Sequence, residues 1–544
     1  MADSGAATVV IAGGGAAGRA AAGALVAGLA ESRSRGSGPG IARIVHLTGP
    51  AAEAIDRTMV DKALMTGRLT PERAVSLRPP VEGVETRDAH LLRVEHTGEG
   101  TGSAAPLRLV LSGGEVLDAA ALIVATGSAP RTLDVPGAAD WREAGRLTSL
   151  HSAADALRIR GLVEAAAEAQ SRLRVIVSGT GLVGSEAAGL LSGADCEVTL
   201  VSRSAVPGAE VLGEPIARAL ADAHSAAVDA RWGARIASLD APPAGGAPGA
   251  VRLDDGTRLE AGLVIAAHGA EPLLPLGLEG LAGEARKQEV VSAAHGTSAV
   301  QGTVHARSAE AVQDTAAARG AEGAQDATAS TGAGGDVLTR VGFRAARGLP
   351  VDGSLRVMSG SPGLPIWAAG AVAAHAGRAE GFGEPGADDR WLVDHWDDAE
   401  AQGAHAARAV LAAFSGADAE GALRADAEGA LHTDAQGAPR ARAGGDGHRT
   451  AAAGAGVRSA AAEAPGSAGR YAPYVPTSAW FARIHGRQLA GFGAVRPGLV
   501  PRTVSEEPLL VEFADPRSGR VEAVVGLDAG RALRAHARTT VLLG

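Results

Sequence analysis

Two glycine-rich turns of the form G-x-G-x-x-G constrain the fold of this chain more than any other feature. The first, at residues 13–18, follows a β-branched run at 8–11 and precedes an alanine-rich helical stretch. The second, at 179–184, follows the apolar run 174–178 and precedes a helical stretch at 185–191. A single match would be weak evidence in a chain with 76 glycines, but two matches between a strand and a helix are not. Because such a turn admits a pyrophosphate at the N-terminus of the helix, the pair predicts two dinucleotide-binding sites.

The other strand and helix patterns predict an α/β fold. Residues 31–40 are expected to form a loop, residues 391–411 a helix, and residues 471–544 a compact α+β unit. Further strands are expected at 41–47, 107–111, 119–124, 197–201 and 263–267, with a hairpin around an Asp-Gly turn at 251–259. We therefore expect two Rossmann-like dinucleotide-binding domains and a small C-terminal α+β domain.

Composition and charge exclude several classes of protein. The chain has 544 residues and a formal net charge of −10, so neither nucleic acid nor an acidic membrane is an expected partner. Its single cysteine, Cys196, excludes an internal disulfide or a dithiol mechanism, and we expect it to be a small buried residue. The 15 histidines show no ligand spacing such as H-E-x-x-H, so no metal is predicted. Since no signal-like or membrane-length apolar run is found, a cytoplasmic protein is expected.

Two long segments and one rare residue type stand out. Residues 281–338 and 416–469 are poor in large apolar side chains, so we expect partly disordered, low-complexity segments there. Lysine occurs only at Lys62 and Lys287, because arginine supplies every other cationic side chain apart from histidine. A lysine that persists in such a chain is a candidate for a specific role.

Two further motifs alternate with the glycine turns along the chain, one after each turn. Residues 125–131 have the form A-T-G-x-x-P-R, and residues 368–372 have the form A-A-G-x-V. In this order the chain resembles the two-dinucleotide flavoprotein reductases of the pyridine nucleotide-disulfide oxidoreductase superfamily, and most closely the ferredoxin and rubredoxin reductase branch. The resemblance implies an enzyme that binds FAD, takes hydride from NAD(P)H and passes electrons singly to a small iron–sulfur protein. It leaves a homodimer open.

The resemblance also implies a domain arrangement. An FAD domain in two pieces, residues 1–145 and 339–415, would enclose an NAD(P) domain at residues 146–280. Residues 470–544 would form the C-terminal reductase or interface domain. The two low-complexity segments, 281–338 and 416–469, would be an insertion and a linker.

Residues near the expected flavin are carried over by motif. Residues 55–62 are similar to the branch's tyrosine-aspartate-arginine-proline-proline-leucine-serine-lysine motif, which brings Arg57 and Lys62 to the flavin. Glu186 matches a glutamate that faces the nicotinamide and can pair with that lysine, so Lys62 and Glu186 are the predicted catalytic residues. A nearby cation stabilises an anionic reduced ring, and a carboxylate keeps the lysine placed and charged. The structural alternatives are a solvated lysine, a first-turn helix carboxylate and, for Arg57, a surface ion pair.

The predicted cofactor-binding residues come from the two turns and the later motifs. Trp396 begins a stretch similar to the branch's tryptophan-to-glutamine-glycine helix, and Phe481 supplies an aromatic ring in the C-terminal domain. The full set is Gly13, Gly14, Gly15, Ala16, Ala17, Gly18, Arg57, Lys62, Ala125, Thr126, Gly127, Arg131, Gly179, Gly181, Leu182, Val183, Gly184, Glu186, Ser202, Arg203, Gly269, Gly370, Ala371, Trp396 and Phe481.

Several acids of the branch are missing. Pro50 stands near the position of the usual ribose-binding acid, with Glu53 the nearest candidate, and Ala371 replaces the aspartate of the last FAD motif. In the C-terminal domain, residues 480–483 read W-F-A-R where the branch has phenylalanine-tryptophan-serine-aspartate. Each lost charge-assisted hydrogen bond weakens FAD binding by about 1.5–3 kcal/mol, so two lower affinity by roughly two to four powers of ten. FAD is still expected to bind.

The second nucleotide site carries a specificity signal. After the strand at 197–201, Ser202-Arg203-Ser204 stands where an acid would bind the adenosine ribose. An acid repels a 2′-phosphate, whereas Arg and Ser can hold one. The sequence therefore predicts NADPH rather than NADH.

Two other functions stay open on the sequence alone. The chain could be an NAD(P)H oxidase or diaphorase with oxygen, a quinone or a dye-like molecule as acceptor. It could also be a degenerate flavoprotein that binds nucleotide without turnover, because the acids expected near Pro50 and at Ala371 are absent.

Overall fold

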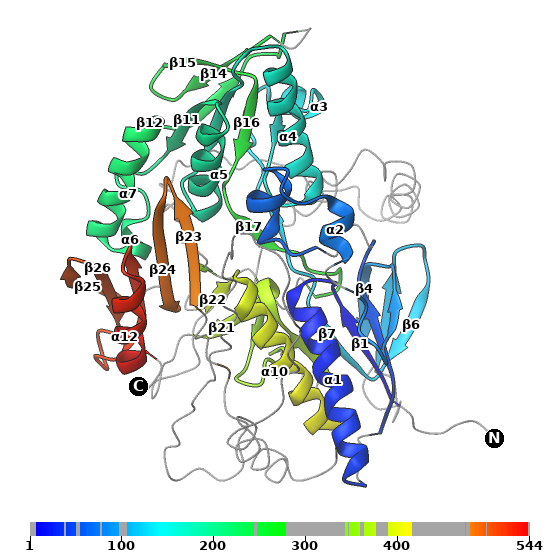
Figure 1. Cartoon of the computed structure of the whole chain (residues 1–544). Helices are drawn as coiled ribbons and strands as arrows, with labels where there is room; N and C mark the ends of the chain where they lie inside the picture. Colours follow the sequence, from blue (N-terminus) through cyan, green and yellow to red (C-terminus); the bar gives the residue numbers. More distant parts are fainter. Residues whose placement is uncertain are drawn as a thin grey trace, which may run out of the picture. The chain divides into compact units, whose positions relative to one another are not determined.

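The computed structural model describes residues 7–36, 40–50, 55–76, 79–96, 106–243, 247–278, 343–345, 348–358, 364–376, 390–415, 474, 479–496 and 498–541. Both segments predicted to be of low complexity, 281–338 and 416–469, lie outside these residues, and so does Glu53. In the described part, parallel sheets alternate with helices (Figure 1). The predicted α/β fold class is therefore confirmed.

The first sheet holds the first glycine turn. Its parallel strands run in the order β20 (Ile366–Ala368), β7 (Ala121–Val124), β1 (Ala7–Ala12), β2 (Ile41–Leu47) and β3 (Glu85–Arg87). Every residue of β7 and β20 is buried, as expected for strands covered on both faces. Because β20 comes after the whole second sheet in the sequence, the first sheet is assembled from two separated pieces of chain.

Helices α1 (Ala16–Ser34) and α10 (Trp396–Phe414) pack against each other beside this sheet (Figure 1). Their close approach requires a glycine, since a Cβ atom at Gly403 would lie 2.0 Å from the carbonyl oxygen of Ala17. Two predicted boundaries are wrong here. α1 runs into the predicted loop at 31–40, where Arg33 suits the last turn of a helix. The helix predicted from residue 391 begins at Trp396, because the buried run before it forms strand β22 (Arg390–Val393).

The second sheet holds the second glycine turn. Its parallel strands run in the order β12 (Asp229–Trp232), β11 (Glu197–Ser202), β10 (Arg174–Ser178), β16 (Leu263–Ala266) and β9 (Leu147–Thr148). The helices of this part are α3 (Ala138–Glu143), α4 (Ala153–Glu168), α5 (Leu182–Gly193), α6 (Ala209–Leu212) and α7 (Glu214–Ala227). At the start of α4, Ser152 and Asp155 form a reciprocal capping box. All five strands and four of the helices lie within the range 146–280 expected for a nucleotide domain.

Smaller sheets extend these two parts. The predicted hairpin is confirmed, since β14 (Gly249–Leu253) pairs antiparallel with β15 (Arg258–Ala261). The strand predicted at 119–124 is confirmed as β7, which begins two residues later than predicted, because Ala119 ends β6 (Val116–Ala119) in a different sheet. The other elements are η2 (Val60–Leu64), α2 (Pro71–Ser76), β4 (Leu91–His96), β5 (Leu107–Leu111), β8 (Ser128–Pro130), β13 (Ile236–Leu239), β17 (Ala270–Pro272), β18 (Phe343–Ala345), β19 (Leu349–Val351), η5 (Gly370–Val372) and β21 (Ala373–Ala376).

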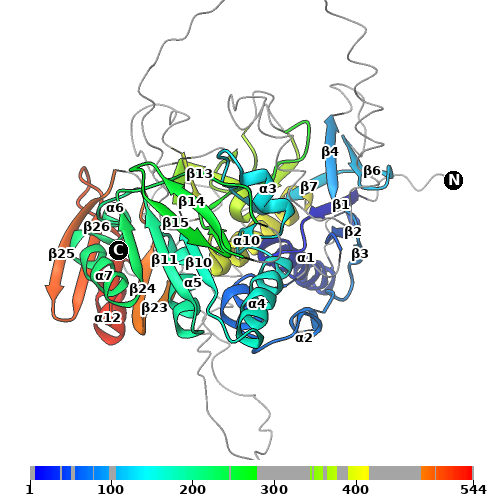
Figure 2. The same ribbon diagram turned by 90° about the horizontal axis from the view of Figure 1, so that it is seen from above.

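The C-terminal part is an antiparallel sheet with one helix. Its strands run in the order β23 (Ala479–Ile484), β24 (Arg487–Gly493), β27 (Val521–Leu527), β26 (Leu509–Ala514) and β25 (Val500–Glu506), and α12 (Gly530–Thr540) packs on β27 and β24. Strand β23 also contacts α5 of the second sheet, and both ribbon views show the two side by side (Figures 1 and 2). This contact brings the C-terminal sheet to the second nucleotide turn.

One apolar cluster links a segment of the first part to the second sheet. Val60 and Leu64 of η2 are buried together with Ala187 and Leu191 of α5. The η2 segment is therefore held on α5, next to the glycine turn that begins that helix.

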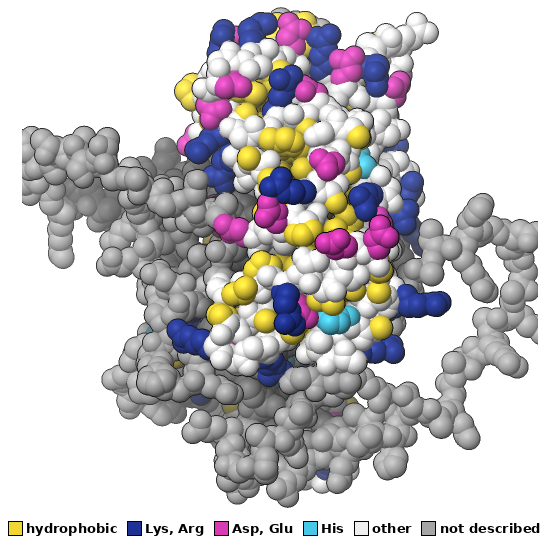
Figure 3. All heavy atoms as spheres, turned by 90° about the vertical axis from the view of Figure 1, so that its left-hand side faces the viewer, with side chains coloured by type: hydrophobic (Ala, Val, Ile, Leu, Met, Phe, Trp, Pro, Cys, Tyr) yellow, Lys and Arg dark blue, Asp and Glu magenta, His cyan; other side chains and the backbone are white. Residues whose placement is uncertain are grey.

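The surface carries charges of both signs. On the side drawn in Figure 3, Lys and Arg side chains are interspersed with Asp and Glu. The ion pair between Arg231 and Asp229, at 2.9 Å, is of this exposed kind, which contributes little to stability. Among the described residues, no helix is both long enough and apolar enough to cross a membrane.

Candidate functional site

Three glycines of the first turn are required by the protein's own packing. Gly13 has a φ of 130°, and a Cβ atom there would lie 2.0 Å from the carbonyl oxygen of Ala125. At Gly14 a Cβ atom would lie 2.5 Å from the oxygen of Thr48, and at Gly18 it would lie 1.8 Å from the oxygen of Gly13. These positions pack the turn against the neighbouring strands and against the helix that follows.

Gly15 differs, because a Cβ atom there would meet nothing within 4 Å. The second turn repeats the pattern: a Cβ atom would lie 2.3 Å from Ala267 oxygen at Gly179 and 2.1 Å from Gly179 oxygen at Gly184, but would be free at Gly181. Gly15 and Gly181 are also the N-cap residues of α1 and α5, and neither helix has a side-chain cap or an acid in its first turn. Each helix thus presents uncapped N–H groups beside open space, which fits a phosphate group.

His46 supports the first turn and was not predicted. It lies in β2, is almost fully buried, and its Nε2 is 2.9 Å from the carbonyl oxygen of Gly13. Burial is the main cause that lowers the pKa of His46 below its ordinary value, so the ring is neutral near pH 7. The only sequence signal was a polar residue at the buried end of a strand.

The motif at 125–131 is held beside a second strand pair. The N–H of Ala125 donates to Ala12 oxygen at 2.8 Å, which joins the motif to the first turn. The N–H of Arg131 donates to Gly269 oxygen at 2.8 Å, where β8 pairs with β17. The hydroxyl of Thr126 donates to the carbonyl of Leu273. The structure therefore brings the predicted residues Ala125, Thr126, Arg131 and Gly269 together.

The motif at 368–372, the last of those expected to bind FAD, packs against the start of α1. The N–H of Gly370 donates to Gln402 Oε1 at 2.8 Å, and a Cβ atom at Gly370 would lie 3.3 Å from the Cβ of Ala17. Ala371 follows with a methyl group that offers no acceptor. Trp396, at the first turn of α10, donates from Nε1 to Glu400 Oε1 at 3.0 Å. The 370–372 segment therefore lies next to both α10 and the start of α1, which follows the first turn.

Lys62 and Glu186 form an ion pair across two parts of the structure. Lys62 Nζ lies 2.8 Å from Glu186 Oε2, and Glu186 Oε1 accepts the N–H of Arg483 at 3.0 Å. Lys62 Nζ also lies 3.0 Å from Asp61 Oδ2. Glu186 therefore joins η2, α5 and β23, and neither a solvated lysine nor an isolated helix-end carboxylate describes this arrangement.

Burial and charge act on this pair in opposite directions. Burial alone would lower the pKa of Lys62, but the charges of Asp61 and Glu186 outweigh it and raise that pKa above the ordinary value. Burial also raises the pKa of Glu186; Lys62 opposes this rise and Asp61 adds to it. The lysine is thus fully charged at neutral pH.

Arg57 lies next to the 125–131 motif. Its Nη1 is 3.3 Å from the carbonyl oxygen of Ser128, which also lies 2.8 Å from Nε2 of His151. Burial, with the charge of Arg57 second, lowers the pKa of His151 to about 4. A cationic guanidinium and a neutral imidazole therefore share one carbonyl at this point.

The residues expected to select the nicotinamide cofactor are also close together. Ser202, almost fully buried, has its Oγ 3.1 Å from the Oγ1 of Thr180 and accepts the N–H of Ser204 at 3.3 Å. Arg203 is exposed. Burial and then the charge of Arg203 lower the pKa of His268 below its ordinary value.

Two exposed apolar side chains lie where β23 meets α5. Phe481 is 60% exposed and Val183, in the first turn of α5, is 44% exposed. Phe481 and Arg483 are two residues apart in β23, so their side chains lie on the same face of the sheet.

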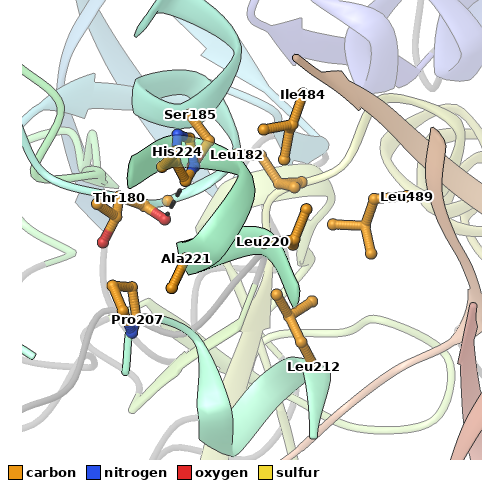
Figure 4. Close-up of a pocket in the computed structure, with 11 residues that line it drawn as sticks. Thr180, Leu182, Ser185, Pro207, Leu212, Leu220, Ala221, His224, Ile484 and Leu489 are labelled. Carbon is orange, nitrogen blue, oxygen red and sulfur yellow. Dashed lines mark hydrogen bonds between the residues drawn. The ribbon is translucent and has the colours of Figure 1, made fainter. Parts of the chain in front are cut away.

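A small cavity of about 20 Å³ lies behind the second turn, between α5, α7 and the C-terminal sheet. Figure 4 shows Thr180 and Pro207 on one side of it and Ile484 and Leu489 on the other. Two of the lining residues contact each other, with His224 Nε2 3.2 Å from Ser185 Oγ. With room for about one water molecule, the cavity by itself is too small to hold a nucleotide.

No metal centre is evident in the described ranges, where no group of three or more His, Cys, Asp or Glu side chains could hold an ion. Cys196 is buried, as predicted, and burial raises the pKa of its thiol.

Comparisons with known proteins agree with this geometry. Residues 7–302 match the family described as pyridine nucleotide-disulphide oxidoreductase. Putidaredoxin reductase CamA of Pseudomonas putida is 32% identical over 218 residues, which is 39% of this chain and 48% of that protein. A nitric oxide reductase FlRd-NAD(+) reductase of Aeromonas salmonicida is 35% identical over 159 residues, 28% of this chain and 37% of that protein. The chain thus spans about half or less of the length of the curated relatives it matches.

Solved structures share the fold. The putidaredoxin reductase in a covalent complex with putidaredoxin has a TM-score of 0.58 at 18% identity, covering 98% of this chain and 93% of that one. A ferredoxin reductase from Rhodopseudomonas palustris has a TM-score of 0.57 at 18% identity, with the same coverage. A water-forming NADH oxidase from Lactobacillus brevis has a TM-score of 0.54 at 14% identity, covering 97% of this chain and 89% of that one.

Proposed function

Because the chain belongs to the pyridine nucleotide-disulphide oxidoreductase family, as its motifs predicted, we propose that it is an FAD-dependent NAD(P)H oxidoreductase. Its electrons would pass to a small iron–sulfur protein of the ferredoxin or rubredoxin class, as the name of its putidaredoxin reductase relative suggests. The observation that carries the proposal is the Lys62–Glu186 pair, which joins a segment following the first nucleotide turn to the helix that begins at the second.

The residues present fit both cofactors. At the first turn, the uncapped N-terminus of α1 and the open side of Gly15 would hold the FAD pyrophosphate, with residues 370–372 beside it. At the second turn, the N-terminus of α5 and Gly181 would hold the pyrophosphate of the nicotinamide cofactor. Bound FAD supplies the hydride acceptor and the change from two-electron to one-electron transfer.

The protein's own side chains would orient one another and stabilise the negative charge that develops at the site. Lys62 provides a fixed positive charge where negative charge develops, and Glu186 keeps its ammonium in place. Arg483 anchors Glu186 through a backbone N–H, so the C-terminal sheet helps to set the position of the carboxylate. No nucleophile or metal is required, since hydride transfer needs two rings held in register.

Purification with added FAD tests this proposal. A yellow protein whose colour is bleached by NADPH, and which then reduces a [2Fe–2S] ferredoxin, is the expected result. Bleaching with transfer only to oxygen, a quinone or a dye would favour the oxidase or diaphorase alternative. A colourless protein that takes up no FAD would contradict the proposal and favour a nucleotide-binding scaffold, as the missing acids at Pro50 and Ala371 allow.

The preference for NADPH over NADH belongs to the same proposal. Ser202 ends β11 and Arg203 follows it, at the position where an acid would exclude a 2′-phosphate. The cytoplasmic location expected from the sequence is proposed as well, and cell fractionation would check it.

A further inference from the structure

The ammonium group of Lys62 has two carboxylate partners. Besides Glu186 Oε2 at 2.8 Å, it contacts Asp61 Oδ2 at 3.0 Å and Asp61 Oδ1 at 3.3 Å. Asp61 Oδ1 also accepts the backbone N–H of Lys62 at 2.8 Å. Asp61 therefore contacts both the backbone N–H and the side-chain ammonium of Lys62.

Both carboxylates are buried and the lysine is less so. The side chains of Asp61 and Glu186 are 8% and 7% exposed, whereas that of Lys62 is 37% exposed. One cation therefore faces two buried anions, and the cluster carries a net charge of −1 when all three groups are ionised. A buried charge without a full counter-charge is costly and acts strongly on any charged group that comes near.

A role for Asp61 in helix capping does not account for this arrangement. Asp61 lies in the first turn of η2, but η2 has only five residues and so a small dipole. An acid that served the helix end alone would need only the backbone contact, whereas Asp61 turns its second oxygen to the ammonium. The contact with the second oxygen of Asp61 gives Lys62 Nζ an additional counter-charge.

We propose that Asp61 is a positioning residue that shares the Lys62 ammonium with Glu186 and leaves this three-residue cluster of the hydride-transfer site with a net negative charge. In the motif that residues 55–62 resemble, a serine precedes the lysine, so this anion is a feature of the present chain. Its consequence rests on the proposed function: a residual negative charge opposes the build-up of negative charge on a reduced flavin. Asp61 thereby offsets part of the stabilisation that Lys62 would provide.

The chain makes a direct test practical, because its only lysines are Lys62 and Lys287. With ¹³C at the lysine Cε, the full-length protein should show two lysine signals, and Lys287→Arg removes one of them. The remaining signal then reports the pKa of Lys62. We expect Asp61→Asn and Glu186→Gln each to change the protonation equilibrium of Lys62 by about tenfold towards the neutral form.

The matched control is Glu72→Gln, which removes the same charge from a fully exposed residue of α2. It should leave the Lys62 titration unchanged. A Lys62 titration that Asp61→Asn does not move, while Glu186→Gln does, would overturn the inference. Should Asp61→Asn fold poorly by circular dichroism, Asp61→Ser provides the same readout with a smaller side chain.

The second readout uses FAD-loaded protein without nicotinamide. At a fixed ratio of oxidised to reduced reference dye, Asp61→Asn should raise the ratio of reduced to oxidised flavin about tenfold, and Glu72→Gln should not. An unchanged or smaller ratio would contradict the effect on the flavin. Because the lysine titration does not depend on FAD, a protein that fails to bind FAD would reject the proposed function while Asp61 remained testable.

Discussion

At the scale of single residues, Gly15 offers a clean test of the first site, because no protein atom lies within 4 Å of a Cβ atom added there. Gly15→Val should fold normally but bind FAD about a hundredfold more weakly, or about 3 kcal/mol, since the added methyl groups would occupy the space of the phosphate. Titration with FAD followed by fluorescence measures this. The control is Gly23→Val, on the same helix and equally unobstructed. Equal FAD affinity in both variants would contradict the assignment.

Arg203 provides the test of cofactor preference. Arg203→Glu should repel a 2′-phosphate and shift the ratio of kcat/KM for NADPH over NADH towards NADH by about tenfold or more. Steady-state kinetics with both cofactors, using a dye as acceptor, gives this ratio. The control is Arg172→Glu, an exposed position just before the amino end of β10 and so at the opposite edge of this parallel sheet, which should leave the ratio as it was.

Sequence reasoning identified residues that belong to a local motif and missed residues whose partners lie elsewhere. The glycines of both turns were predictable, since a six-residue pattern determines their geometry. The pairing of Lys62 with Glu186 was expected only through a resemblance, and the structure shows it at 2.8 Å. His46 and His151 were not identified, because each acts on a carbonyl that is distant in sequence.

At the scale of elements, the contact between α1 and α10 depends on one missing side chain. Gly403→Ala would place a methyl group 2.0 Å from the backbone oxygen of Ala17, so the two helices must separate. We expect a loss of about 1–3 kcal/mol in unfolding free energy, measured by urea denaturation. Gly161→Ala in α4 meets nothing within 4 Å and should be neutral or stabilising by up to about 1 kcal/mol. Equal effects of the two changes would contradict this account of the packing.

Element types were easier to predict than element ends. The strand–turn–helix units were predictable because apolar runs and glycines are local signals. The start of α10 was not, since the run Arg390–Val393 is apolar enough for either state and pairing with β21 decides for a strand. The strand predicted at 119–124 begins two residues later, as β7, because Ala119 belongs to β6, which joins β5 in another sheet.

At the scale of the whole molecule, His224 makes the junction between the second sheet and the C-terminal sheet sensitive to pH. Its Nδ1 lies 2.9 Å from His485 Nε2, and burial, followed by the neighbouring His485, lowers the pKa of His224 to about 4. The unfolded chain binds this proton with an ordinary pKa of about 6.5. The contribution to stability is therefore complete above pH 6.5 and is lost as the pH falls towards 4.

Urea unfolding at pH 7 and pH 5 measures this effect. Over that interval His224 accounts for a loss of about 2 kcal/mol, and His224→Gln should reduce the pH-dependent loss by this amount. The exposed His96 at the end of β4 is the control, and His96→Gln should preserve the wild-type pH dependence. An unaltered pH dependence in His224→Gln would contradict the role of the junction. No sequence pattern suggested this pair, whose members lie in α7 and after β23.

The place of β20 in the first sheet has a consequence for synthesis on the ribosome. The second sheet has all its strands once residue 266 has emerged, whereas the first sheet waits for residue 368 and its covering helix for residue 414. At about 5–20 residues per second, roughly 5–20 s separate the completion of the two sheets. During that interval the first glycine turn exists without β20 and α10, so the second glycine turn can reach its complete surroundings on the nascent chain before the first one does.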